Sequence, residues 1–158
     1  MTETSLLDAI ADGDRLLLDT TILAAYLDAT DATHPVARYV LGELVETGRN
    51  PGVVSMITVM EVLVRPLRAS PPGHHTVLAF LRGHPNLEYV PVDLHVAQEA
   101  AHLRAADRFA PPDALIVGTG LAVQVRHLVT NDRDWTPKLA RMAERIAVVQ
   151  ASDHLPFP

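Results

Sequence analysis

The strongest constraint on the fold is a regular alternation of short apolar runs with longer segments of helical pattern. Each apolar run has about the length of a buried β-strand and is followed by polar turn residues or by a helical pattern. The runs expected to form strands are residues 15–18, 53–54, 87–92, 126–130 and 147–149. Strands that alternate with helices pair into a parallel sheet with helices on both faces. The chain is therefore predicted to be an α/β protein with a central parallel sheet of about five strands.

Several helical segments between these runs have an apolar side that predicts burial. Residues 20–29 are expected to form the first such helix, and the segment 113–123 is apolar nearly all round, so it is expected to be buried. Gly118 and Gly120 lie inside this second segment and are expected to allow close packing. Spacings of three and four residues place two apolar triplets on single helix faces: Val36, Val40 and Leu44, and Val96, Ala100 and Leu103.

Serine, threonine and proline mark the expected helix boundaries. Ser55 is expected to cap the helix that contains Glu61, because a serine side chain can accept from the first free amides. Residues 70–73 (Ser-Pro-Pro-Gly) are expected to form a loop before a helix over residues 75–82. Thr136, followed by Pro137, is expected to cap a further helix.

The length of 158 residues fits a single domain, with no repeat or linker that divides it. We expect a lead-in over residues 1–15, the α/β domain over residues 16–150 and a tail over residues 151–158. The start of the chain is acidic and polar, unlike a signal peptide. The apolar runs are far shorter than the roughly 20 residues that cross a bilayer. We therefore expect a cytoplasmic protein that makes no membrane contact.

The composition excludes several kinds of chemistry. The absence of cysteine excludes disulfides, zinc–thiolate sites, iron–sulfur clusters and thiol catalysis. The formal net charge of −6 argues against non-specific nucleic-acid binding through a broad basic groove. Any nucleic-acid binding would instead have to depend on local charges.

Four carboxylates occupy positions that solubility alone does not explain. Asp19 ends the first predicted strand, and Asp132 follows the fourth. In open α/β sheets, ligands bind outside the carboxyl ends of the strands. Asp113 lies in the first turn of the buried helix, and Glu61 lies in a mostly apolar helix. Converging carboxylates with no histidine or cysteine partner favour Mg²⁺ or Mn²⁺.

Each of these acids also has an ordinary structural explanation. Asp19 could cap the helix that follows it, and Glu61 could pair with Arg65 one turn later. Asp113 could complement the helix dipole, and Asp132 could shape a turn. Together, however, clustered carboxylates destabilise one another unless a cation compensates them. A metal site therefore explains the set better than four independent caps and turns do.

The motifs around these acids resemble the PIN-domain family and, within it, VapC-type ribonuclease toxins of type II toxin–antitoxin systems. The resemblance covers residues 16 to about 149, with all the motifs in the family's order. They are Leu17-Leu18-Asp19-Thr20-Thr21-Ile22-Leu23, Ser55-x-x-Thr58-x-x-Glu61-Val62, Pro112-Asp113-Ala114-Leu115-Ile116-Val117, and Leu128-Val129-Thr130-Asn131-Asp132-Arg133-Asp134-Trp135. Trp135 replaces the phenylalanine that is commoner at its position.

The resemblance implies a five-stranded PIN fold and a Mg²⁺- or Mn²⁺-dependent endoribonuclease that forms homodimers and is inhibited by a cognate antitoxin. It assigns the catalytic metal site to Asp19, Glu61, Asp113 and Asp132, with Asp134 as a further possible ligand. It also makes Thr20 and Asn131 candidates for supporting hydrogen bonds.

Arginine binds phosphate through two donors, and twelve of the thirteen basic residues are arginine. Arg133, beside Asp132, is therefore the first candidate for substrate binding, followed by Arg65 and Arg68. Divalent ions would cancel negative charge where phosphate must bind, so RNA binding is expected to depend on metal and on these few arginines.

Other function classes fit less well. A haloacid dehalogenase would need a second aspartate two residues after Asp19, where the chain has Thr21. A response-regulator receiver would need a lysine after a late strand, and the only lysine, Lys138, lies in a predicted helix. A non-catalytic PIN-fold module that binds RNA or protein stays open, because a fold does not determine an activity.

Overall fold

Five parallel strands form one central sheet in the computed structural model, which describes residues 3–69 and 71–157. The ends of the predicted lead-in and tail (Met1, Thr2 and Pro158), together with Ser70, lie outside the described residues. The strands are β1 (Leu16–Leu18), β2 (Gly52–Ser55), β3 (Leu87–Val90), β4 (His127–Thr130) and β5 (Ala147–Gln150). All four neighbouring pairs are parallel. The predicted α/β class and the number of strands are confirmed.

The strand order is β3-β2-β1-β4-β5, so the direction of winding reverses between β1 and β4. These two strands pair directly, with Leu17 opposite Leu128 and Leu18 opposite Val129. A reversal of this kind leaves a crevice at the carboxyl ends of the two central strands, where α/β proteins bind ligands. The residues that follow β1 and β4 therefore flank the expected ligand site.

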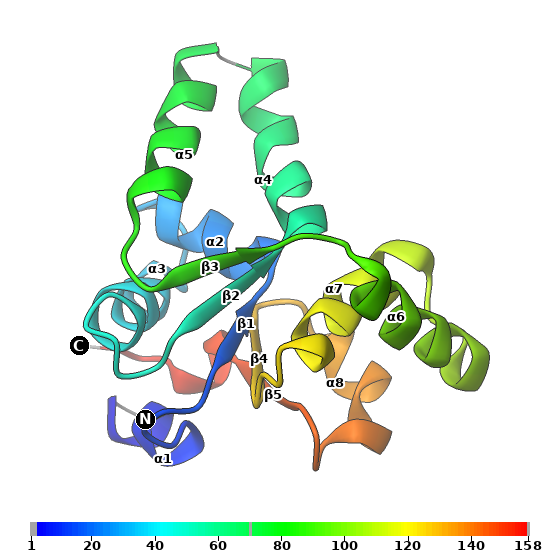
Figure 1. Ribbon diagram of the computed structural model, residues 1–158. Helices are drawn as coiled ribbons and strands as arrows, with labels where there is room; N and C mark the ends of the chain where they lie inside the picture. The colour runs from blue at the N-terminus through cyan, green and yellow to red at the C-terminus, as the bar shows by residue number, and fades with distance from the viewer. Residues whose placement is uncertain (1–2, 70, 158) are drawn as a thin grey trace.

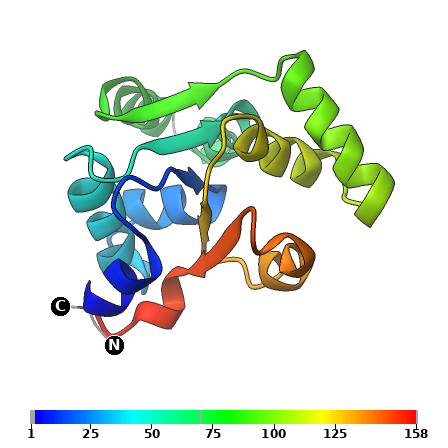
Figure 2. The ribbon, with the colours of Figure 1, turned by 60° about the horizontal axis from the view of Figure 1, so that its bottom comes forward.

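Helices cover both faces of the sheet. Successive strand residues point to opposite sides, so apolar strands present an apolar surface on each face. Leu16 and Leu18 belong to one apolar core, whereas Leu17 belongs to the other. The first core packs beneath α1 (Glu3–Ala9), α2 (Thr20–Leu27), α3 (His34–Tyr39) and the π-helix η1 (Val40–Val45). The second packs beneath α6 (Leu94–Asp107) and α7 (Pro111–Ala122). Figure 2 shows these two groups of helices on opposite sides of the sheet.

The predicted buried helix faces are confirmed. Val36, Val40 and Leu44 are buried in the first core, and Val96, Ala100 and Leu103 are buried in the second. Gly118 allows α7 to lie against α6, because a Cβ atom there would come within 2.9 Å of the Ala100 amide nitrogen. Gly120 would likewise meet Leu17 at 2.9 Å. Both glycines therefore have the packing role that the sequence predicts.

Two helices, α4 (Met56–Ala69) and α5 (Pro71–Gly83), form a hairpin that projects beyond the sheet (Figure 1). Ser55 precedes α4 and accepts a hydrogen bond from the Ile57 amide at 3.2 Å, as expected of a cap. The predicted loop over residues 70–73 is wrong for Pro71, Pro72 and Gly73, which form the start of α5. Proline fits the first turn of a helix, where the missing amide would have no partner within the helix.

The expected cap at Thr136 is also wrong. The helix α8 (Trp135–Lys138) begins two residues earlier than expected, with Asp134 at the capping position. The Thr136 hydroxyl instead accepts a hydrogen bond from Gln150 Nε2 at 3.0 Å. A proline that follows a threonine can be the first residue of a helix or a later residue of its first turn. A short 3₁₀ turn, η2 (Ala140–Met142), follows.

The lead-in and the tail contact each other on one side of the sheet. Leu6 and Ile10 of the lead-in are fully buried in the first core. The tail forms the 3₁₀ turn η3 (Ala151–His154), and a hydrogen bond of 2.8 Å joins Ser5 Oγ to His154 Nδ1. Among the described residues, no helix combines the length and the apolar character needed to cross a membrane.

Candidate active site

Asp19 directly follows β1 and is held in one orientation by four hydrogen bonds. Its Oδ1 atom accepts from the Thr21 amide at 3.0 Å, the Ile22 amide at 3.1 Å and the Thr21 hydroxyl at 2.7 Å. Its Oδ2 atom accepts from the Thr130 hydroxyl at 2.5 Å. Asp19 therefore caps α2, which is the ordinary structural alternative considered for it, and its role as a metal ligand stays a prediction. Burial raises the pKa of this carboxyl group, and the four hydrogen bonds oppose that rise.

Thr130 connects Asp19 to Asp132 across the reversal of the sheet. Its hydroxyl donates to Asp19 and also accepts from the Asp132 amide at 2.9 Å. The carboxylate of Asp132 in turn accepts from the Asp134 amide at 2.9 Å, which closes a tight turn. The ends of β1 and β4 are thus joined through one buried hydroxyl. Asp132 thus shapes a turn, as the alternative explanation for it allowed, and its role as a metal ligand stays a prediction.

Glu61 reaches the same edge of the sheet from α4. Its carboxylate accepts a hydrogen bond from the hydroxyl of Thr20, the residue directly after Asp19. Thr20 therefore makes a supporting contact of the kind expected of it. The alternative pairing of Glu61 with Arg65 is not observed among the described ion pairs.

Asp113 lies in the first turn of α7 and binds the only lysine of the chain. Lys138 Nζ donates to Asp113 Oδ2 at 2.8 Å. The hydrogen bond with Asp113 and the charges of Asp113, Asp132 and Asp134 raise the pKa of Lys138, against the smaller effect of desolvation. The ammonium group thus places Asp113 beside the turn that contains Asp132 and Asp134.

Asn131 is oriented by two threonines, Thr21 in α2 and Thr33 directly before α3. Its amide donates to the Thr21 hydroxyl at 2.8 Å, and its Nδ2 atom donates to the Thr33 hydroxyl at 2.5 Å. Its Oδ1 atom is buried without a hydrogen-bond partner among the described residues. Asn131 therefore holds the turn after β4 against α2, as a supporting residue would.

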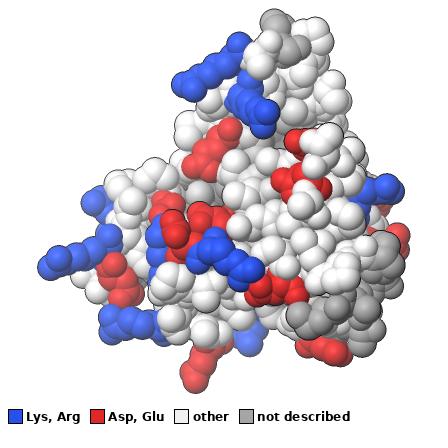
Figure 3. Space-filling view, turned by 180° about the vertical axis from the view of Figure 1, so that it is seen from behind, with Lys and Arg blue, Asp and Glu red and all other residues white. Residues whose placement is uncertain are grey.

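The three candidate arginines lie apart from this hydrogen-bonded cluster. Arg133 Nη2 donates to Ser152 Oγ at 2.8 Å and to Asp153 Oδ1 at 2.6 Å, so phosphate would compete with the tail for it. Arg65 and Arg68 are exposed on α4. Acidic and basic side chains are interspersed over the face shown in Figure 3. A role for these arginines in substrate binding stays a prediction.

The donor set has the chemistry of a site for a hard divalent ion. Its members supply only carboxylate oxygens, which Mg²⁺ and Mn²⁺ prefer, and one cationic ammonium group already lies against them. In residues 3–69 and 71–157, however, no three histidine, aspartate or glutamate side chains converge closely enough to hold an ion as they stand. The residue types therefore fit a metal, and the side chains would have to converge on binding.

The sequence comparisons agree with the arrangement of the strands and acids. The family model for the PIN domain matches residues 16–144 of the chain. The chain belongs to the PIN domain family. The match begins with β1 and ends just before β5, so it includes all the candidate acids of this PIN domain and leaves out α1. The sequence matches no curated protein significantly.

Solved structures with the same fold come from several bacteria. A toxin–antitoxin complex from Klebsiella pneumoniae has a TM-score of 0.65 at 21% identity, over 87% of this chain and 97% of that chain. FitAcB from Neisseria gonorrhoeae has a TM-score of 0.64 at 20% identity, over 87% of this PIN domain chain and 98% of its own. VapC20 of Mycobacterium tuberculosis is described as a toxin that cleaves the sarcin-ricin loop. It has a TM-score of 0.61 at 16% identity, over 77% of this chain and 93% of its own. At these identities the likeness establishes the fold.

Sequence reasoning does not find several polar residues of this candidate site, among them Lys138 and Thr130. In the sequence Lys138 argues only against a receiver domain, and its place on a short helix gives no sign of contact with Asp113, 25 residues earlier. Thr130 lies inside the fourth motif, at the end of a predicted strand, and the sequence there indicates only a strand residue. A buried threonine at the carboxyl end of a strand next to an acid is a signal that could have suggested its role.

Proposed function

We propose that this PIN domain is a metal-dependent endoribonuclease of the VapC type, which hydrolyses RNA phosphodiester bonds at the carboxyl ends of β1 and β4. The observation that supports this most directly is the hydrogen-bonded link from Asp19 through Thr130 to Asp132 across the reversal of the sheet. That link holds the two acids that follow β1 and β4 at the position where α/β proteins bind ligands. Family membership supplies independent support.

Asp19, Glu61, Asp113 and Asp132 are the residues that would hold Mg²⁺ or Mn²⁺, with Asp134 as a further possible ligand. A bound divalent ion would supply positive charge to the phosphate and lower the pKa of a water for in-line attack. Thr20, Thr21 and Thr130 keep Glu61 and Asp19 oriented before any ligand arrives.

The test is cleavage of total RNA with Mn²⁺ or Mg²⁺, with and without a chelator, by the wild type and a matched pair of variants. Glu61→Gln removes a candidate ligand while keeping the size of the side chain. Glu88→Gln removes an exposed carboxylate that pairs with Arg15 at the opposite edge of the sheet. Cleavage is expected for the wild type and Glu88→Gln, and is expected to fall at least about 100-fold for Glu61→Gln. Equal, chelator-insensitive cleavage by all three proteins would contradict the proposal.

A non-catalytic module that binds RNA or protein is the alternative, and one observation favours it. No three acidic or histidine side chains among the described residues are close enough to bind an ion without moving. A thermal melt separates the two functions, because a ligand that binds only the folded state raises the melting temperature. Stabilisation by Mn²⁺ supports the nuclease, and no stabilisation together with no cleavage supports the module.

Partners follow from the same assignment. The proposal includes a cognate antitoxin, a homodimer and action on RNA in the cytoplasm. The Klebsiella pneumoniae structure is a complex of toxin and antitoxin, which makes an antitoxin the first partner to seek. A small gene next to this one should encode a protein that binds this chain and abolishes cleavage. Sedimentation of the purified chain tests the homodimer directly.

A further inference from the structure

Lys138 is the one lysine in the chain, and its ammonium group lies against the proposed metal site. It donates to Asp113 at 2.8 Å, and its Nζ atom lies 5.1 Å from the centre of the Trp135 ring. Trp135 is buried, so the aromatic face is a fixed support for the cation. Two independent contacts therefore define the position of this charge, although the side chain is 40% exposed.

The surroundings of Lys138 are acidic on two sides. Asp113 contacts it from α7, and Asp132 and Asp134 attract it from the turn after β4. Asp132 is joined through Thr130 to Asp19, and Glu61 lies against Thr20. The charges of three carboxylates, those of Asp113, Asp132 and Asp134, thus act on one ammonium group. A single positive charge here offsets part of the repulsion that a divalent ion would otherwise have to relieve.

We propose that Lys138 is a built-in counter-ion of the acidic site, which holds Asp113 in the metal-free protein and must release it when a divalent ion binds. This inference rests on the proposed function. In its terms Lys138 competes with the metal ion for Asp113, so it weakens metal binding while it stabilises the metal-free fold. Lys138 acts through Asp113 and is a positioning residue.

A neighbouring ion pair provides a matched control. Arg141 lies three residues after Lys138 and pairs with Asp107 at 2.9 Å, with 81% of its side chain exposed. Asp107 is at the end of α6 and is no part of the proposed site. Removing either cation breaks one surface ion pair, but only Lys138 contacts a candidate ligand. A general effect of net charge would change both variants alike, whereas competition for Asp113 would change one.

The first experiment measures Mn²⁺ binding by calorimetry on the whole chain. Lys138→Met should tighten the Mn²⁺ dissociation constant roughly two- to fivefold, the range expected for loss of an exposed ion pair. Lys138→Arg keeps the charge and should bind as the wild type does, and Arg141→Met should leave the constant unchanged. An unchanged or weaker constant for Lys138→Met would overturn the proposal, as would an equal tightening in Arg141→Met.

The second experiment uses the fact that the chain has one lysine. Labelling of lysine at the ε-carbon gives one side-chain NMR signal, which belongs to Lys138. Titration with Mg²⁺ should move this signal in the wild type. The midpoint of the movement should match the Mg²⁺ concentration at which the melting temperature rises. In Asp113→Asn the ion pair is already broken, so the signal should start near its released position and move less. A signal that stays fixed while the wild type binds Mg²⁺ would overturn the proposal.

The outcomes also separate this inference from the proposed function. A wild type that neither binds a divalent ion nor cleaves RNA overturns both. A wild type that binds the ion and cleaves RNA, with no difference in Lys138→Met, overturns the counter-ion role alone.

Discussion

Charged residues are common both at the carboxyl edge of the sheet, where the parallel strands end, and at the amino edge, where they begin. The two edges differ in how these charges are paired. At the carboxyl edge lie five candidate acids, and among the described residues one of them, Asp113, pairs with a basic side chain, that of Lys138. At the amino edge, each of three polar pairs joins one acid to one basic side chain. They are a hydrogen bond of 2.7 Å between Asp14 and His127, and the ion pairs of Arg15 with Glu88 and of Arg49 with Asp12 at 3.9 Å.

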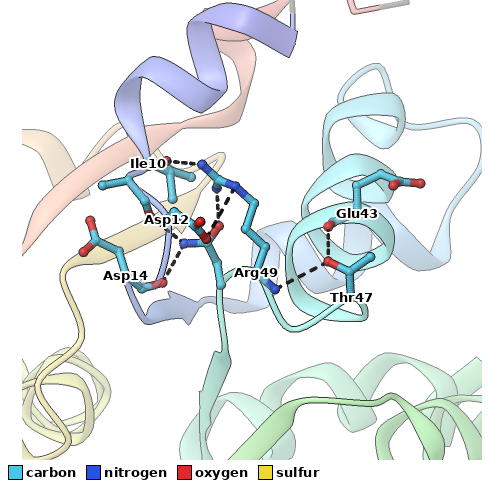
Figure 4. A network of polar contacts seen from close by, with 8 residues as sticks. Ile10, Asp12, Asp14, Glu43, Thr47 and Arg49 are labelled. Carbon is cyan, nitrogen blue, oxygen red and sulfur yellow. Dashed lines mark hydrogen bonds and ion pairs between the residues drawn. The ribbon is translucent and has the colours of Figure 1, made fainter.

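The amino edge is also completed by backbone contacts (Figure 4). Asn50 is fully buried, and its Nδ2 atom donates to the Ala11 carbonyl at 2.8 Å and to the Asp14 carbonyl at 2.9 Å. Arg49 donates to the Ile10 carbonyl at 3.1 Å. This network ties the lead-in to the loop before β2. Its polar groups satisfy one another, which is what a stabilising network requires.

The difference separates a region whose charged groups already stabilise one another from a region whose carboxylates can still bind a cation. Groups that are paired one to one have little further affinity for a ligand. Carboxylates in excess over local bases leave an uncompensated charge, and a cation that binds there gains from all of them. The carboxyl edge is thus predicted to control activity, and the amino edge to control folding.

The largest expected effect is on activity at the carboxyl edge. Asp19→Asn keeps an oxygen that can accept from the Thr21 and Ile22 amides but removes the buried charge. RNA cleavage should fall at least about 100-fold. The melting temperature should change little, because the raised pKa of Asp19 shows that burial disfavours its charged form. Full activity in this variant, or its failure to fold, would break the contrast between the edges.

The second effect is on stability at the amino edge. Asn50→Ala removes a buried donor from two carbonyl oxygens and should lower the free energy of unfolding by about 2–4 kcal/mol. Cleavage per folded molecule should be unchanged. Asp12→Asn is the control, because the Asp12 side chain is 83% exposed and its ion pair should contribute less than about 0.5 kcal/mol. Urea denaturation measures both, and equal losses would mean that burial does not govern this edge.

A smaller effect is expected from breaking either of two ion pairs whose cations, Lys138 and Arg141, lie three residues apart. Asp113→Asn and Asp107→Asn each break one pair, with Lys138 and with Arg141. Each should change the free energy of unfolding by less than about 1 kcal/mol, because exposed ion pairs contribute little. Mn²⁺ should raise the melting temperature of Asp107→Asn as it does for the wild type, and should have less effect on Asp113→Asn. The same response in both would remove Asp113 from the metal site.

The smallest effect concerns pH at the contact between the lead-in and the tail. Burial lowers the pKa of His154 below its usual 6.5, and the nearby charge of Asp153 opposes this. The unfolded chain therefore binds a proton more readily than the folded chain does, so stability should fall as pH decreases from about 6.5 through the lower folded pKa. His154→Gln should flatten this part of the pH profile, as measured by thermal melts. An unchanged profile would show that other groups control it.

Much of the fold could be predicted because its signals are local. The apolar run at residues 15–18 and the apolar spacing of Val96, Ala100 and Leu103 depend only on near neighbours along the chain. The errors also have local causes. At Pro71 and at Thr136, proline marks either the end of one structure or the first turn of the next, and the sequence alone does not distinguish these cases.

The sequence by itself determined the parallel α/β class, the buried helix faces and the identity of the candidate acids, because periodicity and residue chemistry are written along the chain. Only the tertiary structure decided that β1 and β4 are neighbours, since strand order depends on how distant segments pack. That pairing brings Thr130 to Asp19 and places the turn after β4 beside α2. The contact of Lys138 with Asp113 has the same origin, because no local pattern links residues that meet only when two helices pack at one edge of a sheet.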